Sequence, residues 1–486
     1  MVRNSLPQFG TIIMLETTPF SAVKTRFCPS PTGYLHLGNV RTALFSALYA
    51  KHANGCFLLR IEDTDKTRSD DIFTQALMKD LRWLDLHWQE GVDAGGDAGP
   101  YYQSQRQAIY DAYYDQLIEK KFAYPCFCSE EQLTLQRALQ QKSGKPPRYA
   151  GTCRTLTQEQ IAEKRSLGLI PTLRFCIPKD KIITFIDTVR GEQKFDPNDL
   201  GDFVIRRADG TSPFMYGNAI DDALMGVTHV LRGEDHLTNT PRQIAILSAL
   251  ELPVPTYGHI ALIVGNDGSP LSKRHGSRSL HALRDEGFLP IAIVNYLARL
   301  GHYYGHDNYL TFEQLAVEFK IQSLAKSPAK FNEQQLLFWQ TQAVMKLSDV
   351  EFWNWVGKDI QSLVPDNKQS AFVAAIKPNV KFPAEVKAWA ESLFAELPEW
   401  NETQQTVIQA AGKDYFSEAL IALEHHGANA EKITTHLKEK CNVKGKALFM
   451  PLRIALTGFE HGPDLAVLFS LISPQTMKRR FERAVF

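Results

Sequence analysis

The sequence predicts an α/β fold built on a parallel sheet, followed by an all-α C-terminal half. Near the N-terminus, apolar and charged residues alternate at 23–27, apolar residues then recur with helical spacing from Val40, and a mostly apolar run follows at 57–61. This order of strand, helix and buried parallel strand is the opening half of a doubly wound nucleotide-binding fold. From residue 279 onward, apolar and charged residues mix with helical spacing, which favours helices.

Composition sets bounds on the class of protein. A chain of 486 residues is too long for one core and indicates two to four domains. Lys+Arg and Asp+Glu balance at 54 each, so a nucleic-acid surface would be a local patch. The 7 cysteines are mostly scattered, which fits a reducing cytosol better than a disulfide framework. No run approaches the roughly 18 apolar residues of a membrane span, so we expect a soluble, cytoplasmic protein. Residues 1–21 are read as an N-terminal extension or an early start, with Met14 as an alternative start.

The turn after the first strand, PSPTGYLHLGN at 29–39, concentrates residues with special backbone preferences. Its prolines end the strand, and the next helix starts beside His36 and runs to the Asn54-Gly55 stop signal. The turn falls at the carboxyl end of a strand, where such folds bind ligands, and a helix N-terminus suits a phosphate. Gly38 would let a flat ligand approach the backbone, and His36 could donate to a phosphate oxygen. The alternative is a Pro/Gly loop with a surface histidine, and the standard GxxxxGK(S/T) and GxGxxG phosphate loops are absent.

A second loop, VGNDGSPLSKRHGSR at 264–278, carries several cations and follows an apolar run at 260–264. It therefore also leaves a strand at its carboxyl end. A lysine facing an anion pocket is what adenylyl transfer needs, because the departing pyrophosphate must be neutralised. The alternative interpretation is a solvated polar loop.

Several segments together resemble bacterial glutamyl-tRNA synthetase, a class I aminoacyl-tRNA synthetase. PSPTGYLHLGN looks like the HIGH signature of the class, and PLSKR at 270–274 looks like its KMSKS loop. The more specific matches are RFCPSPTG (26–33), RIEDTD (60–65), IDDALMGVTHVLRGEDHLTNTPRQ (220–243), LSKRHG (271–276) and KALFMPLRIALTG (446–458). The resemblance runs from about residue 22 to the C-terminus. It implies a class I synthetase Rossmann-type parallel sheet with an inserted acceptor-binding domain, followed by an all-α anticodon-binding half.

With this resemblance the chain divides into segments of different expected roles. These are the N-terminal extension (1–21), the first half of the Rossmann catalytic domain (22–101), the inserted acceptor-stem-binding domain (102–218), the second Rossmann half (219–262), the KMSKS loop with a stem-contact helical domain (263–345), and the helical anticodon-binding domains (346–486).

The resemblance places the glutamate site on charged residues at strand ends. Arg26 and Arg232 can form bidentate pairs with carboxylates, and Glu62 and Ser30 match the family's contacts to the amino group. Asn218 is a further contact. The family commonly has tyrosine where this chain has Phe214, so a hydroxyl contact to glutamate would be missing. A site of this charge should reject glutamine by several kcal/mol. The competing interpretation is that Arg26 and Glu62 merely pair with each other.

The implied reaction has two steps and needs ATP and Mg2+. Glutamate attacks the α-phosphate of ATP, and the glutamyl group then passes to the terminal adenosine of tRNA(Glu). The resemblance makes His36 and Lys273 the catalytic residues and assigns ATP contacts to His36, Gly38, Asn39, Ser272, Lys273 and Arg274. Pro270 stands where the KMSKS loop begins with lysine, which leaves Lys273 as the main phosphate partner.

Three cysteines in the inserted segment have the pattern of a zinc site. Cys126, Cys128 and Cys153 could be thiolate ligands. Some family members supply a histidine two residues after the third cysteine, but this chain has Thr155 there. Tyr149 could be the fourth ligand, as in the related enzyme that glutamylates queuosine. Three reduced cysteines without a metal are an equally weighted alternative.

The C-terminal half is expected to contact the anticodon through Arg453, Gly462 and Pro463, by resemblance. The family's discriminating members use an arginine against the third anticodon base, and no arginine occurs between residues 366 and 400. We therefore hypothesise relaxed or altered tRNA selection, with tRNA(Gln) as a second substrate. The expected partners are tRNA, L-glutamate and ATP, with no membrane and a monomeric state.

Three other functions compete with this assignment. A glutamyl-queuosine tRNA(Asp) synthetase shares the catalytic half but lacks anticodon domains, and the roughly 160 helical residues beyond 325 disfavour it. A general nucleotidylyltransferase is disfavoured by the IEDTD and LRGEDH segments. A catalytically silent tRNA-binding paralogue is disfavoured because the site residues are all present.

Overall fold

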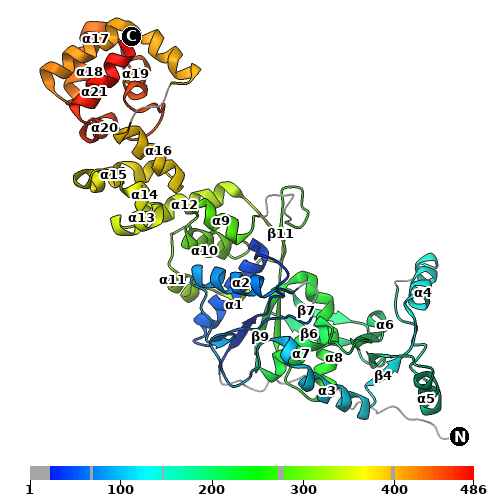
Figure 1. The fold of residues 1–486 in the computed structure, drawn as a ribbon. Coiled ribbons are helices and arrows are strands. Elements are labelled where there is room, and N and C mark those ends of the chain that lie inside the picture. The colour runs from blue at the N-terminus through cyan, green and yellow to red at the C-terminus, as the bar shows by residue number, and fades with distance from the viewer. Residues whose placement is uncertain (1–21, 66–68, 145–146, 272–277, 396–399, 486) are drawn as a thin grey trace. The chain divides into compact units, whose positions relative to one another are not determined.

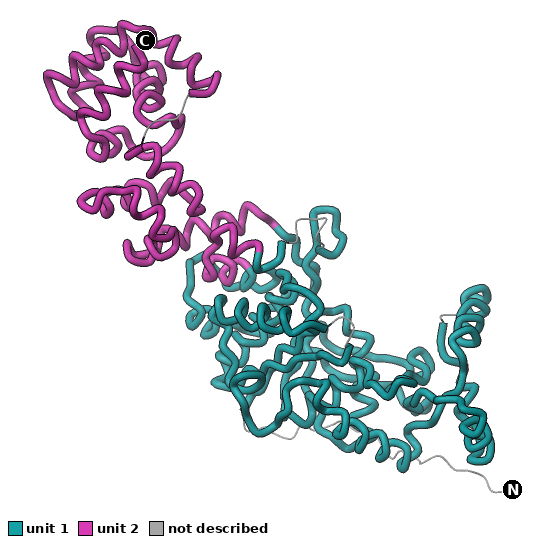
Figure 2. The backbone as a smooth tube through the Cα atoms, viewed as in Figure 1, with its two compact units in different colours: residues 1–281, 297–331 teal, residues 282–296, 332–486 magenta. Residues whose placement is uncertain are grey.

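The computed structural model describes residues 22–65, 69–144, 147–271, 278–395 and 400–485. Its internal contacts divide the chain into two compact units, shown in Figure 2. Unit 1 comprises residues 1–281 and 297–331, and unit 2 comprises residues 282–296 and 332–486. The N-terminal extension lies outside the described residues, and the finer boundaries expected from the sequence stay predictions.

Unit 1 is built on parallel strands, as the sequence predicts. β1 (Lys24–Phe27), β2 (Cys56–Leu59) and β3 (Glu90–Gly91) form one parallel sheet, and β9 (His229–Gly233) pairs in parallel with β10 (Thr256–Ile260). The Thr228 N–H donates to the Lys24 carbonyl at 2.9 Å, which sets β9 beside β1 (Figure 1). The ends of these strands carry the residues singled out by the sequence.

The helix after the first turn forms where the apolar spacing predicts it. α1 (Leu37–His52) buries Val40, Leu44 and Leu48 on one face, with at most 1% of each exposed. It ends before Asn54, which adopts a positive φ of 50° as a stop residue can. α2 (Asp71–Trp83) follows β2.

The middle of the chain adds a second, antiparallel sheet to unit 1. β4 (Ala123–Cys126), β5 (Thr172–Phe175) and β8 (Phe203–Arg206) form this sheet, and β6 (Ile183–Asp187) and β7 (Gly191–Phe195) form a separate hairpin. An aromatic core that includes Tyr114, Phe175 and Tyr216 packs the sheet onto neighbouring helices. The helices of this region are α3 (Gln107–Glu119), α4 (Glu130–Lys142), α5 (Gln158–Ser166), α6 (Pro197–Leu200), α7 (Phe214–Leu224) and α8 (Thr240–Leu250), with 3₁₀ turns η1 (Gln103–Gln105) and η2 (Glu234–Asn239).

The end of unit 1 returns to the cation-rich loop. β11 (Ile263–Val264) pairs in parallel with β12 (Ala329–Lys330), and α11 (Phe312–Glu318) and η4 (Ile321–Ser323) precede β12. The helical spacing over 280–300 predicts one continuous stretch, but the structure has α9 (Leu280–Glu286) and α10 (Pro290–Arg299). Gly287 separates them because its φ of +99° is incompatible with a helix.

Beyond Lys330, the regular elements among the described residues are all helical, which confirms the predicted all-α C-terminal half. The α-helices are α12 (Glu333–Lys346), α13 (Asp349–Val356), α14 (Lys358–Gln361), α15 (Gln369–Ile376), α16 (Pro383–Phe394), α17 (Glu402–His426, kinked at Gly412), α18 (Ala430–Cys441), α19 (Lys446–Thr457), α20 (Leu465–Leu471) and α21 (Pro474–Val485), with 3₁₀ turns η5 (Asp366–Lys368) and η6 (Lys377–Asn379). A search of the described part of the chain finds no helix whose length and apolarity would let it cross a membrane.

Candidate active site

Two arginines that are distant in sequence meet at the ends of neighbouring strands. Arg26 lies on β1 and Arg232 on β9, and both are buried, with 3% and 5% exposed. The Arg26 Nη1 donates to the carbonyl of Leu231, the residue before Arg232, at 3.4 Å. The structure therefore places both guanidinium groups in one buried region, as a shared ligand site requires.

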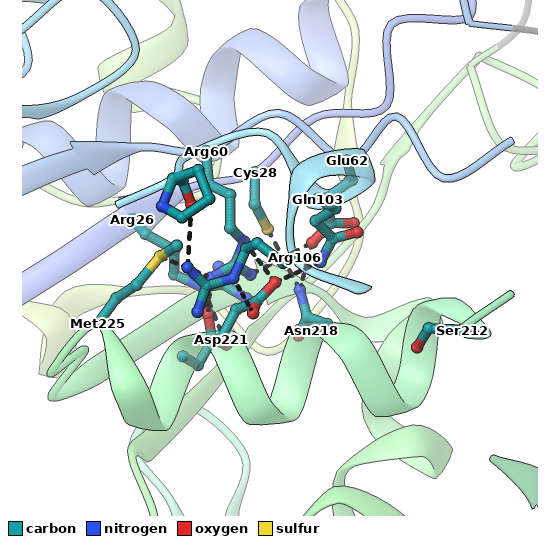
Figure 3. A network of polar contacts seen from close by, with 12 residues as sticks. Arg26, Cys28, Arg60, Glu62, Gln103, Arg106, Ser212, Asn218, Asp221 and Met225 are labelled. Carbon is teal, nitrogen blue, oxygen red and sulfur yellow. Dashed lines mark hydrogen bonds and ion pairs between the residues drawn. The ribbon is translucent and has the colours of Figure 1, made fainter. Parts of the chain in front are cut away.

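A network of buried charges surrounds Arg26 (Figure 3). Asp222 on α7 accepts from the Arg26 Nε at 3.2 Å and pairs with the Arg60 Nη1 at 2.9 Å. Burial is the largest influence and lowers the pKa of Arg26, but its neighbours, Asp222 first among them, together outweigh burial and the pKa is raised. Arg26 is thus a neutralised cation: the structure pairs Arg26 with Asp222 and Glu62 with Arg60, and not Arg26 with Glu62 as in the competing interpretation.

The neighbouring Asp221 anchors a second part of this network. It accepts from the Arg106 Nε at 2.6 Å, the Tyr110 hydroxyl at 2.7 Å and the Gln103 amide at 2.8 Å. These donors come from η1, α3 and the residue between them, so Asp221 ties that segment to α7. These contacts use both carboxylate oxygens of Asp221, so contact with a ligand is left to other residues.

Glu62 follows β2, and only one of its two carboxylate oxygens accepts hydrogen bonds from the described residues. Its Oε1 accepts from the Asn218 amide at 2.7 Å and from the Arg60 Nη2 at 3.2 Å. Its Oε2 is buried without a hydrogen-bond partner. Burial raises the pKa of Glu62 in spite of the opposing effect of Arg60. An unpartnered buried carboxylate oxygen is costly and indicates a missing cation or donor.

Arg232 is also incompletely paired, but its unpartnered atom is a donor nitrogen and not an acceptor oxygen. Its Nη2 donates to Thr240 and to Gln243, both at 2.7 Å, and its Nη1 is buried without a partner. Among the described residues it has no ion-pair partner, and burial lowers its pKa. The Gln243 amide in turn donates to the Asn218 oxygen at 3.0 Å. One hydrogen-bonded path therefore connects Glu62, through Asn218 and Gln243, to the guanidinium group of Arg232.

The charges around this path do not cancel. The guanidinium groups of Arg26, Arg60, Arg106 and Arg232 outnumber by one the carboxylates of Glu62, Asp221 and Asp222. Cys28, whose sulfur accepts from Asn218, stays a thiol because burial raises its pKa to about 12. The arrangement suits a ligand that has one net negative charge and also carries a cationic group.

The turn that precedes α1 lies at the same end of the sheet. The Glu62 N–H donates to the carbonyl of Pro29 at 3.0 Å, and the turn leaves Ser30 and His36 exposed. His36 is the N-cap residue of α1, but its side chain forms no capping hydrogen bond. A Cβ on Gly38 would approach the His36 ring at 3.2 Å. Gly38 therefore gives room to the imidazole, a reason that differs from the ligand approach expected from the sequence, and Asn39 is half-buried in the first helical turn.

The cation-rich loop returns to this turn. Ser272, Lys273 and Arg274 lie outside the described residues. Before them, the Leu271 N–H donates to the carbonyl of Ile263 at 2.9 Å. After them, Ser279 forms an antiparallel bridge with His36, and the Leu280 N–H donates to the carbonyl of Leu35 at 2.9 Å. The described end of the loop is thus fixed beside the HIGH-like turn.

Phe214 lies near the site but supplies no polar group. Its ring packs against His236, with 5.1 Å between the ring centroids. Asn218 follows one helical turn later on α7 and is fully buried.

The cysteines singled out by the sequence form a cluster in unit 1. The sulfur atoms of Cys126, Cys128 and Cys153 lie within 4.8 Å of one another. The Tyr149 hydroxyl is 3.3 Å from the Cys126 sulfur and 3.6 Å from the Cys128 sulfur, and it accepts from the Cys153 N–H at 2.8 Å. Although burial opposes the change, hydrogen bonds from Tyr149 and Arg174 lower the pKa of Cys126 to about 7. The donor set therefore fits a tetrahedral thiolate site.

In unit 2, the predicted anticodon residues also come together. The Arg453 Nη1 on α19 donates to the carbonyl of Pro463 at 2.7 Å. Gly462 has a φ of +144°, and a Cβ there would come within 2.3 Å of the Trp389 ring. Only glycine fits this position.

Sequence reasoning missed the residues that hold the site's charges in place: Arg60, Arg106, Asp221, Asp222 and Gln243. A usable signal was present for some of them. Arg60 interrupts the apolar run of β2, and the two aspartates interrupt the apolar face of α7.

Comparison with known proteins agrees with this geometry. The family model for the catalytic domain of class I tRNA synthetases (E and Q) matches residues 22–338, and an anticodon-binding domain model matches residues 312–485. The glutamate–tRNA ligase 2 of Coxiella burnetii (strain RSA 331) is 58% identical over 95% of this chain and 99% of its own length. The glutamate–tRNA ligase 2 of Nitrosococcus oceani is 49% identical over 96% of this chain and 98% of its own length.

A solved structure is similar over the same span. The glutamate tRNA ligase of Elizabethkingia meningosepticum, crystallised with its amino acid, has 28% sequence identity and a TM-score of 0.85, covering 96% of this chain and 99% of that one. The parallel sheet, the helical C-terminal half and matches along nearly the whole length agree with one another. The chain belongs to the glutamate–tRNA ligase family of class I tRNA synthetases and has the class I synthetase fold.

Proposed function

We propose that the protein is a glutamate–tRNA ligase, which activates L-glutamate with ATP and transfers the glutamyl group to the 3′-terminal adenosine of tRNA(Glu). One observation carries the amino-acid specificity: two unpartnered buried atoms of opposite charge, the Glu62 Oε2 and the Arg232 Nη1. Glutamate has an ammonium group for the first and a carboxylate for the second. Glutamine would leave the guanidinium without an anion, so it should be rejected.

Each site residue then has a role. Arg26 and Arg232 hold carboxylate groups, and Glu62 and Ser30 hold the amino group. Asn218 orients Glu62 through its amide, and Phe214 supplies apolar contact.

Activation takes place at the N-terminus of α1. His36, Gly38 and Asn39 would contact ATP there, together with Ser272, Lys273 and Arg274 from the loop. The glutamate α-carboxylate attacks the α-phosphate and pyrophosphate leaves, with Mg2+ screening the phosphate charges. The 2′-hydroxyl of the terminal adenosine then attacks the acyl carbon of glutamyl-adenylate, forming the ester as the acyl–phosphate bond breaks and AMP leaves. Positioning and electrostatic stabilisation account for the chemistry, since no covalent enzyme intermediate is needed.

ATP–pyrophosphate exchange tests this proposal. Exchange is measured with and without added tRNA, and we expect it with glutamate and little with glutamine, together with charging of tRNA(Glu). A silent paralogue would show no exchange, and a queuosine-modifying enzyme would glutamylate tRNA(Asp) instead. The anticodon-domain match over 312–485 supports the ligase over that enzyme.

Lys273 can be tested separately. Lys273→Ala should slow adenylate formation at least tenfold and leave glutamate binding largely intact, because the resemblance assigns this lysine to the phosphates and not to the amino acid. An unchanged rate of activation would refute the role.

The choice of tRNA is tested by charging. We propose that Arg453, Gly462 and Pro463 contact the anticodon, and that the lack of arginine over 366–400 relaxes selection so that tRNA(Gln) is also charged. Strict exclusion of tRNA(Gln) would contradict the second part.

We also propose that Cys126, Cys128, Cys153 and Tyr149 hold zinc. The metal would have a structural role, tying the end of β4 to the 149–153 turn. Metal analysis of protein prepared without chelator should find about one zinc per chain, and Cys126→Ser should lose it whereas Cys441→Ser should not. A metal-free wild-type protein would favour the alternative of three reduced cysteines.

Family membership further supports a monomer in the cytoplasm, which mass measurement in solution and fractionation of cells would check.

A further inference from the structure

Arg232 is held by neutral groups only. Its Nε donates to the His259 Nε2 at 3.2 Å, and its Nη2 donates to the Thr240 hydroxyl and the Gln243 amide oxygen. Arg26, in contrast, pairs directly with Asp222. A guanidinium oriented without a carboxylate keeps its full charge for a ligand, and it should discriminate most strongly against a neutral amide.

His259 can accept from Arg232 in one form only. The Nε2 of an imidazole is an acceptor when the ring is neutral and the proton is on Nδ1. The Thr240 hydroxyl also lies 2.9 Å from the His259 Nε2 and can donate to it when this nitrogen carries no proton. A proton on Nε2 would point at the Arg232 N–H and break the contact.

Asp187 selects that form. Its Oδ2 lies 2.5 Å from the His259 Nδ1, and both groups are fully buried. Its carboxylate also accepts from the backbone N–H groups of Val189, Arg190 and His259, at 2.9, 2.7 and 3.2 Å. Although burial opposes it, the hydrogen bond from His259 lowers the pKa of Asp187, which keeps it ionised. A fixed anion at Nδ1 holds the proton there.

We propose that Asp187 and His259 are positioning residues for Arg232: Asp187 holds His259 in its Nδ1–H form, and the free Nε2 lone pair fixes the guanidinium so that it selects an acidic amino acid. Asp187 lies at the end of β6, in a hairpin outside the parallel sheet, and His259 stands opposite Arg232 in the β9–β10 register. The carboxylate thus orients Arg232 through one intervening ring without neutralising it. This inference rests on the proposed glutamate specificity of the site.

Asp187→Asn is the sharpest test. The amide oxygen can still accept backbone N–H groups, but the amide nitrogen would donate to the His259 Nδ1 and force the proton to Nε2. We expect the KM for glutamate in ATP–pyrophosphate exchange to rise at least tenfold, with kcat and the KM for ATP changed by less than about threefold. The preference for glutamate over glutamine in kcat/KM should fall.

Two substitutions of His259 separate positioning from packing. His259→Gln places an amide oxygen near the position of Nε2 and should keep the KM for glutamate within a few-fold of wild type. His259→Leu removes the acceptor and should raise it as Asp187→Asn does. His229→Leu is the matched control, since His229 lies on the same pair of strands but bonds to Thr228 and Tyr49 instead, and its KM should not change.

Long-range ¹H–¹⁵N spectra of histidine-labelled protein report which ring nitrogen of His259 carries the proton. A change in packing alone would not alter that result. The His259 ring should show the Nδ1–H form in the wild type and the Nε2–H form in Asp187→Asn. Unchanged glutamate KM values in Asp187→Asn and His259→Leu would overturn the proposal. So would an equal loss in His259→Gln and His259→Leu, or an Nε2–H ring in the wild type. If the wild type itself fails to exchange with glutamate, the proposed function fails, and the spectra still report whether Asp187 sets the tautomer.

Discussion

Buried charge is distributed very differently between the two compact units. In unit 1, buried arginines, aspartates and a glutamate form one network that includes Arg26, Arg60 and Asp222. In unit 2, the buried charged side chain among the described residues is Arg480 on α21. The buried charges of the two units differ in the chemistry of their partners and not in how many partners they have.

Arg480 has a structural role, because the acceptors of its hydrogen bonds all belong to the protein. Its guanidinium donates to the carbonyls of Ser392 at 2.6 Å and Ala395 at 3.2 Å, and also to that of Leu456. These carbonyls belong to the last turns of α16 and α19 or the residue just after, where helices leave acceptors unsatisfied and carry partial negative charge. Every contact is therefore to the chain itself.

The unit 1 network is incomplete by comparison. Glu62 and Arg232 each keep one buried polar atom without a partner. A protein retains such atoms at a cost in stability, and the usual reason is a ligand that satisfies them. Buried charge in unit 2 thus serves folding, and we propose that part of the buried charge in unit 1 is available to bind a ligand.

The largest expected effect comes from breaking the unit 1 network at its centre. Arg60→Met would leave Glu62 without its ion-pair partner and Asp222 with Arg26 alone, and removing one member of a buried ion pair costs about 3–5 kcal/mol. Calorimetric unfolding of the full chain should show a strongly destabilised unit 1 transition. The surface variant Lys120→Met, which removes an exposed pair with Glu251, should cost less than about 1 kcal/mol. Equal effects would mean that the network contributes nothing special.

A smaller effect is expected in unit 2. Arg480→Met keeps the side-chain volume but leaves the buried carbonyls at the helix ends without donors, which should cost about 1–3 kcal/mol. Only the unit 2 transition should shift. Arg479→Met, the exposed neighbour, is the control and should leave both transitions in place.

The smallest change in energy, with the clearest functional signature, is expected for Glu62→Gln. The KM for glutamate should rise about tenfold, or about 1.4 kcal/mol, because the amide cannot pair with an ammonium group. Glu90→Gln on β3 is the control, since Glu90 pairs with Lys24 away from the site. A normal KM in Glu62→Gln would remove Glu62 from the proposed site.

The same substitution has a pH signature. Burial raises the pKa of Glu62, so the folded protein binds this proton more tightly than the unfolded chain does. The free energy of unfolding should therefore fall as pH rises from about 4.3, the ordinary glutamate value, through the raised pKa. This component of the pH dependence should be absent in Glu62→Gln, as urea unfolding between pH 4 and 7 would reveal.

Individual helices could be predicted because the residues that specify each one lie close together in the sequence. The apolar spacing after Val40 and the Asn54 stop were enough to predict α1. The interruption at Gly287 was missed, although Gly287 and Pro290, where α10 begins, are ordinary stop and start signals for a helix. Arg26, Glu62 and Arg232 came from the resemblance, and their partners Arg60, Asp222 and Gln243 did not.

By itself, the sequence determined the helices and strands, the order of the two halves and the family, since periodicity and motifs depend on residues close together along the chain. Only the tertiary structure decided which charges are neutralised and which stay available. Pairing depends on distance and burial in three dimensions, and an arginine in a sequence looks the same whether an aspartate faces it, as Asp222 faces Arg26, or a neutral imidazole does, as His259 faces Arg232.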